Sequence, residues 1–378
     1  MNKRNINKKL RTEIFMGLLF VITIFLLSIF NIVAKDREFS NRENRVLAES
    51  PAITFSSIKD GTFMKKFESY LSDQFAFRDF YMNIRSVSEL VLGNKESNGV
   101  YYGKNKMLFE KTVDFGQYDS KNREAISAFL DKYSDLNKYM MIVPNSAWVM
   151  EEELPKYAPI NDQEAQIKEW ENYLGDKIQF INLCDTMKSH KDEYIYYNTD
   201  HHWTTLGAYY AFLEFSGVAG IESNFNNYKT YAVKNDFSGT LESKSGYMVD
   251  DDVISVYIPN DEENVIVTDG DNVTASLYDS TKLESSEPYG VFLGGNSGFK
   301  EINTMSDSGR NIIIFKDSYA NCFIPFMTQY FTNIYVVDPR YYYDDIESII
   351  KEKNITDILF LYNGNTLFED SSIYQVLQ

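Results

Sequence analysis

Residues 311–326 read NIIIFKDSYANCFIPF, an apolar, β-branched run that ends in Lys316, Asp317 and Ser318. A short apolar run that ends in polar residues predicts a buried strand. A helix-like segment, 319–331, follows at once. The pattern therefore predicts that Ser318 lies where the carboxyl end of a strand meets the N-terminus of a helix.

Four other runs have the same character. They read YMMIVPN (139–145), IQFINL (178–183), NIYVVDP (333–339) and DILFLYN (357–363). Helix-like segments alternate with the strands at about 119–135, 163–175, 204–216 and 344–352. Short apolar strands separated by helices predict an α/β fold with a parallel sheet covered on both faces. Its functional site is expected at the carboxyl ends of the strands.

Residues 220–300 interrupt this alternation. They are acidic and rich in Asn, Ser, Gly and Thr, and VISVYIP (253–259) and NVIVTDG (264–270) alternate as antiparallel strands do. We expect a small β-rich insertion there.

The N-terminal region carries a long apolar segment. Ile14 to Ala34 is uncharged, and as a helix it can cross a hydrocarbon core of about 30 Å. Five basic residues precede it, which predicts a cytoplasmic N-terminus and an extracytoplasmic body after Lys35. A cleaved signal peptide is the alternative, although the run exceeds the roughly 7–15 residues of a signal h-region. We expect an anchor over 1–35, a tether and helical lead-in over 36–98, and the main domain over 99–378.

Charge and cysteine content exclude two classes of function. The net charge is −18, and the acidic body after residue 35 would repel nucleic acid. Cys184 and Cys322 are the only cysteines, so they cannot build a four-cysteine metal site. The two cysteines form either a disulfide or two small buried apolar residues.

Ser318 is the candidate nucleophile, because N–H groups at a helix start can stabilise an oxyanion. The alternative is that Asp317 or Ser318 only caps the helix. A serine nucleophile needs a base, usually histidine. The chain has three histidines, and His190 lies in the charged stretch MKSHKDE, so the base is expected to be His201 or His202.

The segment NTDHHWTTLGAYYAF (198–212) holds both of these histidines. In an extended segment, Asp200 and His202 project to one side and His201 to the other. We therefore expect His202 to be the base and Asp200 the carboxylate that orients it. Two alternatives are a helix start capped by Asn198 or Thr199, and a metal site, which would need further ligands. We expect no metal.

DHHWTTLGAYYA together with FKDSYANCFIPF resembles the DHHW family of bacterial envelope proteins, which is related to the SGNH-like domains of the alginate O-acetyltransferases AlgX and AlgJ. The resemblance extends to SNRENRVLAESP (40–51), FESYLSDQFAFRD (67–79) and VVDPRYYYDD (336–345). It implies an SGNH-hydrolase-like three-layer sandwich with Asp200, His202 and Ser318 as the catalytic set. Lys316 stands where the usual SGNH pattern has glycine, and the Asp-x-His element precedes the serine, which favours the alginate-type branch.

The resemblance also implies an oxyanion hole, and the residue types after one strand end and beside the histidines suggest a substrate site. Gly295 and Asn296, in GGNSG (294–298), and Asn145, after a strand, are oxyanion-hole candidates, although GGNSG also fits a glycine-rich turn. Asn363 also follows a strand end. The candidates for substrate binding are Arg340, Tyr341 and Trp203. A structural ion pair for Arg340 and a core position for Trp203 are the alternatives.

We expect a membrane-anchored extracytoplasmic O-acetyltransferase that acts on a cell-envelope polysaccharide through an acyl-enzyme on Ser318, without a cofactor. Because acetyl-CoA is not available outside the membrane, the resemblance implies a membrane-bound O-acyltransferase partner that supplies acetyl groups. A carbohydrate esterase with the same triad and a non-catalytic polysaccharide assembly or binding protein are the alternatives. The sequence leaves the identity of the glycan open.

Overall fold

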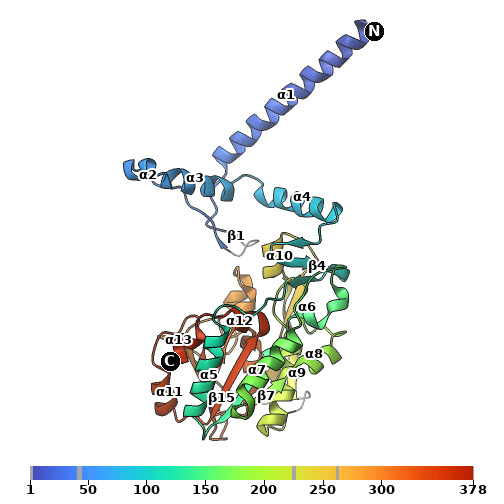
Figure 1. Cartoon of the computed structure of the whole chain (residues 1–378). Coiled ribbons are helices and arrows are strands. Elements are labelled where there is room, and N and C mark those ends of the chain that lie inside the picture. Colours follow the sequence, from blue (N-terminus) through green and yellow to red (C-terminus); the bar gives the residue numbers. More distant parts are fainter. Residues whose placement is uncertain (1–2, 41–44, 224–226, 261–263, 378) are drawn as a thin grey trace. The chain divides into compact units, whose positions relative to one another are not determined.

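The computed structural model describes residues 3–40, 45–223, 227–260 and 264–377 (Figure 1). The chain divides into two compact units, Met1–Leu92 and Gly93–Gln378. The membrane-helix candidate belongs to the first unit, and the predicted sheet belongs to the second.

The first unit begins with the long helix α1 (Lys3–Val33). Its stretch Thr12–Val33 has a mean hydropathy of 2.6 and is long enough to cross a bilayer. Length and composition of this kind fit a membrane anchor or a signal sequence. The remaining elements of the unit are β1 (Phe39–Ser40), β2 (Arg45–Val46), α2 (Phe55–Lys59), α3 (Thr62–Asp73) and α4 (Arg78–Val91).

The last turn of α1 packs against the corner between α3 and α4. The backbone N–H of Ala76 donates a hydrogen bond to Oδ1 of Asn31, at 2.8 Å. The rings of Phe30 and Phe77 meet edge to face, with centroids 5.4 Å apart. These contacts make α1 part of the folded unit.

The second unit is built on an eight-stranded sheet with the order β11-β10-β12-β14-β13-β15-β6-β7. Five of its strands are parallel, as the sequence predicts: β14, β13, β15, β6 and β7. Their bounds are β6 (Asn137–Val143), β7 (Gln179–Asn182), β13 (Asn311–Lys316), β14 (Asn333–Val337) and β15 (Asp357–Asn363). β13 and β15 are buried over nearly their whole length, which explains their continuous apolar sequence.

Three antiparallel strands extend this sheet beyond β14: β10 (Ile266–Asp269), β11 (Asn272–Thr274) and β12 (Phe299–Asn303). The expected antiparallel segment over 264–270 thus adds strands to the edge of the main sheet. The alternation of this segment predicts an antiparallel strand correctly, but periodicity carries no information about which sheet the strand joins. Within the same expected insertion, β8 (Tyr228–Phe237) and β9 (Asp252–Pro259) form an antiparallel pair outside this sheet.

Helices cover both faces of the parallel strands. Phe315 and Phe360 are paired in register and share one face, where Phe129 of α5 (Asp119–Lys132) packs on them. Tyr139 lies on the opposite face of the sheet, because its neighbour Met140 is in register with Phe360. Phe215 of α9 (Thr205–Ala219) packs on Tyr139. The unit therefore has the predicted three layers (Figure 1).

The other elements of the second unit surround this core. The short strands β3 (Glu96–Ser97), β4 (Val100–Tyr102) and β5 (Leu108–Glu110) form an antiparallel sheet. The remaining helices are α6 (Ser146–Val149), α7 (Gln163–Leu174), α8 (Cys184–Ser189), α10 (Thr240–Ser245), α11 (Ile346–Glu352), α12 (Gly364–Glu369) and α13 (Ile373–Leu377).

The segment after Ser318 differs from the prediction of a regular helix over 319–331. It forms two short 3-10 turns, Ser318–Cys322 and Ile324–Met327. Pro325 lies at the start of the second turn and cannot donate a helical hydrogen bond. The segment is also buried on all sides, so it lacks the polar face of a surface helix.

Candidate active site

The histidines lie in a tight loop between Tyr196 and Trp203, which pair as an isolated antiparallel bridge. Thr204 caps α9 directly after the loop by accepting a hydrogen bond from the N–H of Gly207. Within the loop, the N–H of His202 donates to Oδ1 of Asp200, at 3.0 Å. This side-chain turn bends the backbone, so the segment is not extended as the alternation argument assumed.

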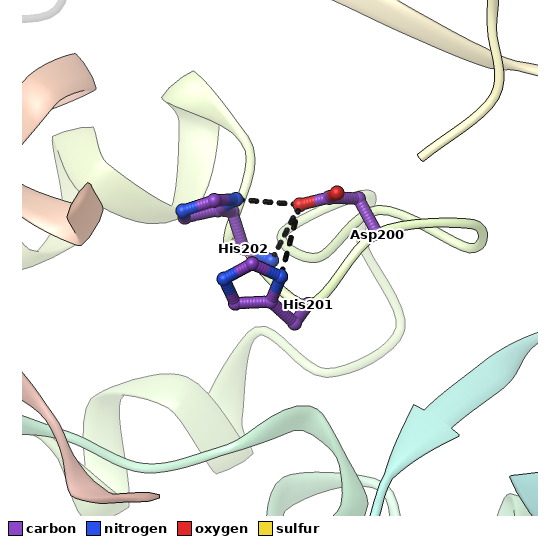
Figure 2. Close-up of side chains that lie close together, drawn as sticks. All are labelled: Asp200, His201 and His202. Atoms are coloured by element: carbon purple, nitrogen blue, oxygen red, sulfur yellow. Dashed lines mark hydrogen bonds and ion pairs between the residues drawn. The ribbon is translucent and has the colours of Figure 1, made fainter. Parts of the chain in front are cut away.

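The loop brings Asp200 and His202 to Ser318. Nδ1 of His202 lies 2.5 Å from Oδ1 of Asp200, and Nε2 lies 2.7 Å from Oγ of Ser318. The three side chains thus form one continuous chain of hydrogen bonds, and Figure 2 shows its Asp200–His202 part. Asp200 and His202 are buried, while Ser318 is partly open. In this arrangement Nδ1 donates to the carboxylate and Nε2 accepts from the serine hydroxyl.

Burial and charge set the ionisation of this pair. Burial, and to a smaller extent His201, lower the pKa of His202 to about 4, although Asp200 opposes the shift. For Asp200, burial alone would raise the pKa, but the two histidines and the N–H of Thr240 hold it below its usual range. At neutral pH the imidazole is therefore unprotonated beside an ionised carboxylate, which is the state a general base needs.

The carboxylate of Asp200 has hydrogen bonds at both oxygens. Oδ1 accepts from His202, and Oδ2 accepts from the N–H of Thr240 at 2.8 Å and from its Oγ1 at 2.9 Å. Asp200, His201 and His202 lie close enough to suggest a metal site. Because the carboxylate and both nitrogens of His202 are already hydrogen bonded, the three residues do not fit a metal ion.

Two rings hold the imidazole of His202. The ring of Tyr289 stacks on it at 3.9 Å between centroids, with 11° between the planes, and the ring of His201 lies at the same distance. Both cannot occupy one face at this separation, so the imidazole lies between them. The prediction that His201 points away is therefore wrong. The bend at Asp200 returns His201 to the site, where its Nδ1 lies 2.7 Å from Oγ1 of Thr240.

Trp203 joins the histidine loop to the serine turn. Its Nε1 donates to the carbonyl of Tyr319 at 2.9 Å, and the hydroxyl of Tyr319 donates back to the carbonyl of His201. The indole is fully buried, and its ring packs against Tyr319 and Phe323. Trp203 is therefore a core residue and offers no face to a sugar, which corrects its place among the substrate-binding candidates.

Asp317 shapes the serine turn as a cap. Its carboxylate accepts from the N–H of Tyr319 at 2.9 Å and from the N–H of Asn363, at the end of β15, at 2.8 Å. Capping by Asp317 was one predicted alternative, and it occurs together with the contact between Ser318 and His202. Ser318 is the first residue of the turn, where N–H groups have no partner inside the helix. Its N–H can therefore serve an oxyanion.

Asp252, at the start of β9, holds the beginning of the histidine loop. Its carboxylate accepts from the backbone N–H groups of Asn198 at 2.9 Å and of Thr199 at 2.7 Å. It also accepts from the hydroxyls of Thr199 and Tyr194, both at 2.6 Å. Burial raises the pKa of this carboxyl, and the hydrogen bonds oppose the shift. The loop is thus anchored from outside the predicted motif.

Lys316, in the place of the SGNH glycine, is fully buried behind the serine turn. Its Nζ donates to Oδ1 of Asn296 at 2.8 Å, to Oδ1 of Asn321 at 2.9 Å and to Asp338 at 3.2 Å. Burial lowers the pKa of Lys316 to about 8, although Asp338 opposes this. Because the oxygen of Asn296 faces Lys316, its amide nitrogen points the other way and remains a candidate donor to an oxyanion.

The other predicted site residues have different surroundings. Arg340 forms a bidentate pair with Asp338, at 2.7 and 2.8 Å, which is the predicted alternative of a structural ion pair. Tyr341 is exposed beside the guanidinium. Gly295 has a positive φ of 90°, as a glycine turn requires. Asn145 is buried, and its carboxamide oxygen accepts from Gln163 and from the N–H of Asn365.

A cleft of about 800 Å³ reaches this site. His201 and Arg340 are among its lining residues, together with Glu110, Lys244 and Asn365. Its lining thus combines charged groups of both signs with amides. Such a surface suits a polar ligand rich in hydroxyl groups.

Cys184 and Cys322 are both buried free thiols, so the predicted alternative of two small buried residues applies. Burial raises the pKa of each thiol to about 12. The thiol of Cys322 contacts the hydroxyl of Tyr289, at 3.2 Å.

Four residues that shape the site escaped the sequence analysis: Gly239, Thr240, Asp252 and Tyr289. All four lie in the segment 220–300, which was interpreted as a small β-rich insertion without site residues of its own other than Gly295 and Asn296. Tyr289 is one of 28 tyrosines and has no distinguishing neighbour in the sequence. Gly239 packs directly on Asp200, which only the folded chain reveals.

Comparison with known proteins gives one family and several related structures. A family model described as "DHHW protein" matches residues 129–337. No curated protein matches the chain. A DHHW family protein from Eubacterium siraeum is 26% identical, with a TM-score of 0.64, over 74% of this chain and 95% of its own.

Two further solved structures share the fold at lower identity. PatB1 from Bacillus cereus, in a structure with a sulfonyl adduct, is 18% identical with a TM-score of 0.62, over 73% of this chain and 98% of its own. The O-acetyltransferase domain of AlgJ from Pseudomonas putida is 15% identical with a TM-score of 0.50, over 74% of this chain and 98% of its own.

Proposed function

Because the chain belongs to the DHHW protein family, we propose that it is an O-acetyltransferase that modifies a cell-envelope polysaccharide. The observation that carries the proposal is the chain of hydrogen bonds from Asp200 through His202 to Ser318. This is the arrangement that acyl-transfer enzymes use to activate a serine. The fold is also that of the O-acetyltransferase domain of AlgJ.

In the first step, Oγ of Ser318 attacks the carbonyl carbon of an acetyl donor while its proton passes to Nε2 of His202. The donor's leaving group departs with that proton, which leaves an acetyl-enzyme. In the second step, a sugar hydroxyl gives its proton to Nε2 and attacks the acetyl carbon. The bond to Ser318 then breaks, and the serine recovers the proton. Asp200 stabilises the imidazolium that forms in each step.

The developing oxyanion needs hydrogen-bond donors near Ser318. The N–H of Ser318 is one candidate, and the side-chain amide of Asn296 is a second. Gly295 gives the backbone the freedom to turn at this point, with its φ of 90°. Asn145 is the weaker candidate, because its side chain is tied to Gln163 and Asn365.

The proposal also covers where the protein lies in the cell and how the acetyl donor reaches its site. We propose that α1 anchors the chain in the cell membrane with the body outside, as its apolar stretch and the five basic residues before it suggest. An acetyl donor must then reach the site from the membrane, and a membrane-bound O-acyltransferase partner would deliver it.

The test is transfer by the purified full chain in detergent, with p-nitrophenyl acetate as donor and an oligosaccharide as acceptor. Acetylated oligosaccharide and an acetyl group on Ser318, both seen by mass spectrometry, are the expected products. Ser318→Ala and His202→Ala are expected to lose roughly a thousandfold or more of the rate with unchanged unfolding temperature. His190→Ala is the matched control, because His190 pairs with Glu193 and stacks on Tyr210 instead.

Free acetate without acetylated oligosaccharide would identify an esterase. Turnover by Ser318→Ala equal to that of the parent would remove Ser318 from the mechanism.

A further inference from the structure

His201 is the one histidine at the site without a place in the mechanism above. Its side chain is 28% exposed and lines the cleft, whereas that of His202 is only 7% exposed. The hydrogen bonds around His201 determine which of its ring nitrogens carries the proton. The position of His201 relative to His202 determines the direction in which the other nitrogen points.

Thr240 fixes the tautomer of His201. The carboxylate of Asp200 is ionised and can only accept, so the hydroxyl hydrogen of Thr240 goes to Oδ2, at 2.9 Å. Thr240 has no second hydrogen to offer, and therefore its Oγ1 accepts from Nδ1 of His201, at 2.7 Å. The neutral ring of His201 must then carry its proton on Nδ1 and a lone pair on Nε2.

The stacking places that lone pair beside the reacting atoms. Nδ1 of His202 and Nδ1 of His201 lie 2.5 and 3.7 Å from the same oxygen of Asp200. The ring planes differ by 37°, with centroids 3.9 Å apart. Both Nε2 atoms therefore lie on the side away from Asp200, as Figure 2 shows. Nε2 of His202 meets Ser318 there, so Nε2 of His201 opens on the same side.

We propose that His201 binds the acyl acceptor, by accepting a hydrogen bond at Nε2 from a second hydroxyl next to the one that is acylated. The inference rests on the proposed transferase function. It names the acceptor class as a vicinal diol, because two adjacent imidazoles whose Nε2 atoms face the same side, with ring centroids 3.9 Å apart, match two hydroxyls on adjacent carbons. One hydroxyl gives its proton to His202, and its neighbour donates to His201. His201 exchanges no proton in the reaction.

Partitioning of the acetyl-enzyme tests this role. With p-nitrophenyl acetate as donor, the ratio of acetylated sugar to free acetate is measured for a sugar with a vicinal diol and for its monodeoxy counterpart. The parent is expected to prefer the diol by about tenfold. His201→Ala is expected to abolish that preference, and His201→Gln to restore part of it, because the Gln amide oxygen reaches the position of Nε2.

A binding measurement separates failure of this inference from failure of the proposed function. In the Ser318→Ala background, the full chain is titrated with both sugars, with and without His201→Ala. Weaker binding of the diol alone after His201→Ala supports the contact, even in a chain that does not turn over. Equal diol preference with and without His201, in both binding and partitioning, overturns the inference.

The tautomer has a spectroscopic signature of its own. In 15N-labelled protein, the neutral ring of His201 is expected to show a protonated Nδ1 and a bare Nε2. Thr240→Val removes the acceptor and is expected to release this preference, with unfolding monitored in parallel. A proton on Nε2 in the parent protein contradicts the proposal directly.

Discussion

One buried carboxylate serves both histidines of this site. Oδ1 of Asp200 bonds to His202 directly, while Oδ2 reaches His201 through the hydroxyl of Thr240. The two adjacent imidazoles therefore turn their Nδ1 edges towards the same acid, while Nε2 of His202 meets Ser318 and Nε2 of His201 faces the same side. At the scale of single residues, the carboxylate of Asp200 therefore fixes the ring orientations of both histidines.

The depressed pKa of His202 predicts an unusual pH profile. Because burial holds this pKa at about 4, the ring stays neutral as the pH falls through the usual imidazole range of about 6.5. The neutral ring is the base, so kcat/KM for an activated acetyl ester should be retained at pH 5.5 and lost as the pH falls towards 4. The measurement is kcat/KM between pH 4 and 8, at constant ionic strength.

Asp200→Asn is the companion variant for that profile. It removes the charge that stabilises a buried protonated imidazole, so the remaining activity should be low at every pH. A parent profile with its acid limb centred at 6.5 would contradict an imidazole held neutral by burial.

A side chain at position 239 is expected to clash with the carboxylate of Asp200. A methyl group at Gly239 would lie 2.3 Å from Cβ of Asp200 and 2.8 Å from its Oδ2, so Gly239→Ala must displace Asp200. A displacement near 1 Å at a catalytic group costs on the order of a hundredfold in rate. We expect such a loss in kcat, together with a lowered unfolding temperature.

Gly217→Ala is the matched control, since it lies in α9 with no atom within 4 Å of the added methyl. It should keep its activity and gain about 0.5–1 kcal/mol in stability. Equal activity losses in the two variants would argue against a specific contact with Asp200.

At the scale of elements, two segments that are far apart in the sequence must be held in register within a few tenths of an ångström. The pair of hydrogen bonds between Trp203 and Tyr319, and between Tyr319 and His201, joins the histidine loop to the serine turn. Asp317 ties the same turn to the end of β15. The site is thus positioned by contacts between loop and turn as much as by the sheet.

Trp203→Phe tests this connection. It removes the indole donor and leaves the carbonyl of Tyr319 buried without that partner, which costs about 1–3 kcal/mol. We expect a lower unfolding temperature and a loss of activity, because the loop that carries His202 is no longer fixed to the turn that carries Ser318. Thermal unfolding and kcat/KM are measured together.

Trp170→Phe separates stability from activity. Trp170 is equally buried and its indole donates to Asp119 at 3.0 Å, between α7 and α5. Trp170→Phe should lose about as much stability as Trp203→Phe. It should nevertheless keep its turnover at a temperature where both variants are folded. If Trp203→Phe lost no more activity than Trp170→Phe for the same loss of stability, the hydrogen bond between loop and turn would have no role in positioning the site.

At the scale of the whole molecule, charge divides along the chain. Residues 35–92 contain nine basic and nine acidic residues, while residues 93–378 contain 23 basic and 45 acidic residues. An anionic membrane surface would repel the acidic unit and leave the neutral one unaffected. This distribution is consistent with a first unit that lies near a membrane.

Deletion of residues 1–34 should therefore move the protein from the membrane fraction to the soluble fraction.

The contacts of Asn31 and Phe30 with the α3–α4 corner predict that α1 is retained in the mature protein. Mass spectrometry of protein purified from membranes should thus detect peptides from the α1 segment. Asn31→Ala removes one contact, keeps the apolar stretch, and should remain in the membrane fraction. A mature N-terminus beyond residue 34 would identify a signal peptide.

The sequence by itself determined the parallel strands, most of their helices and the three residues, Asp200, His202 and Ser318, that the structure joins in one chain of hydrogen bonds. Continuous apolar runs are visible in any window, and a chain with so few histidines leaves little choice of base. Prediction from the sequence failed where contacts join segments that are distant along the chain. The regular helix after Ser318 and the outward-facing His201 were both wrong.

Only the tertiary structure decided how the site is held. Thr240, Asp252 and Tyr289 contribute a hydroxyl, a carboxylate and a ring from a segment whose alternation predicts strands but not their partners. Each acts through a contact of a few ångströms across 40 to 87 positions of the chain. Local pattern encodes which face of an element is buried, but the partner at that face is chosen when the whole core packs.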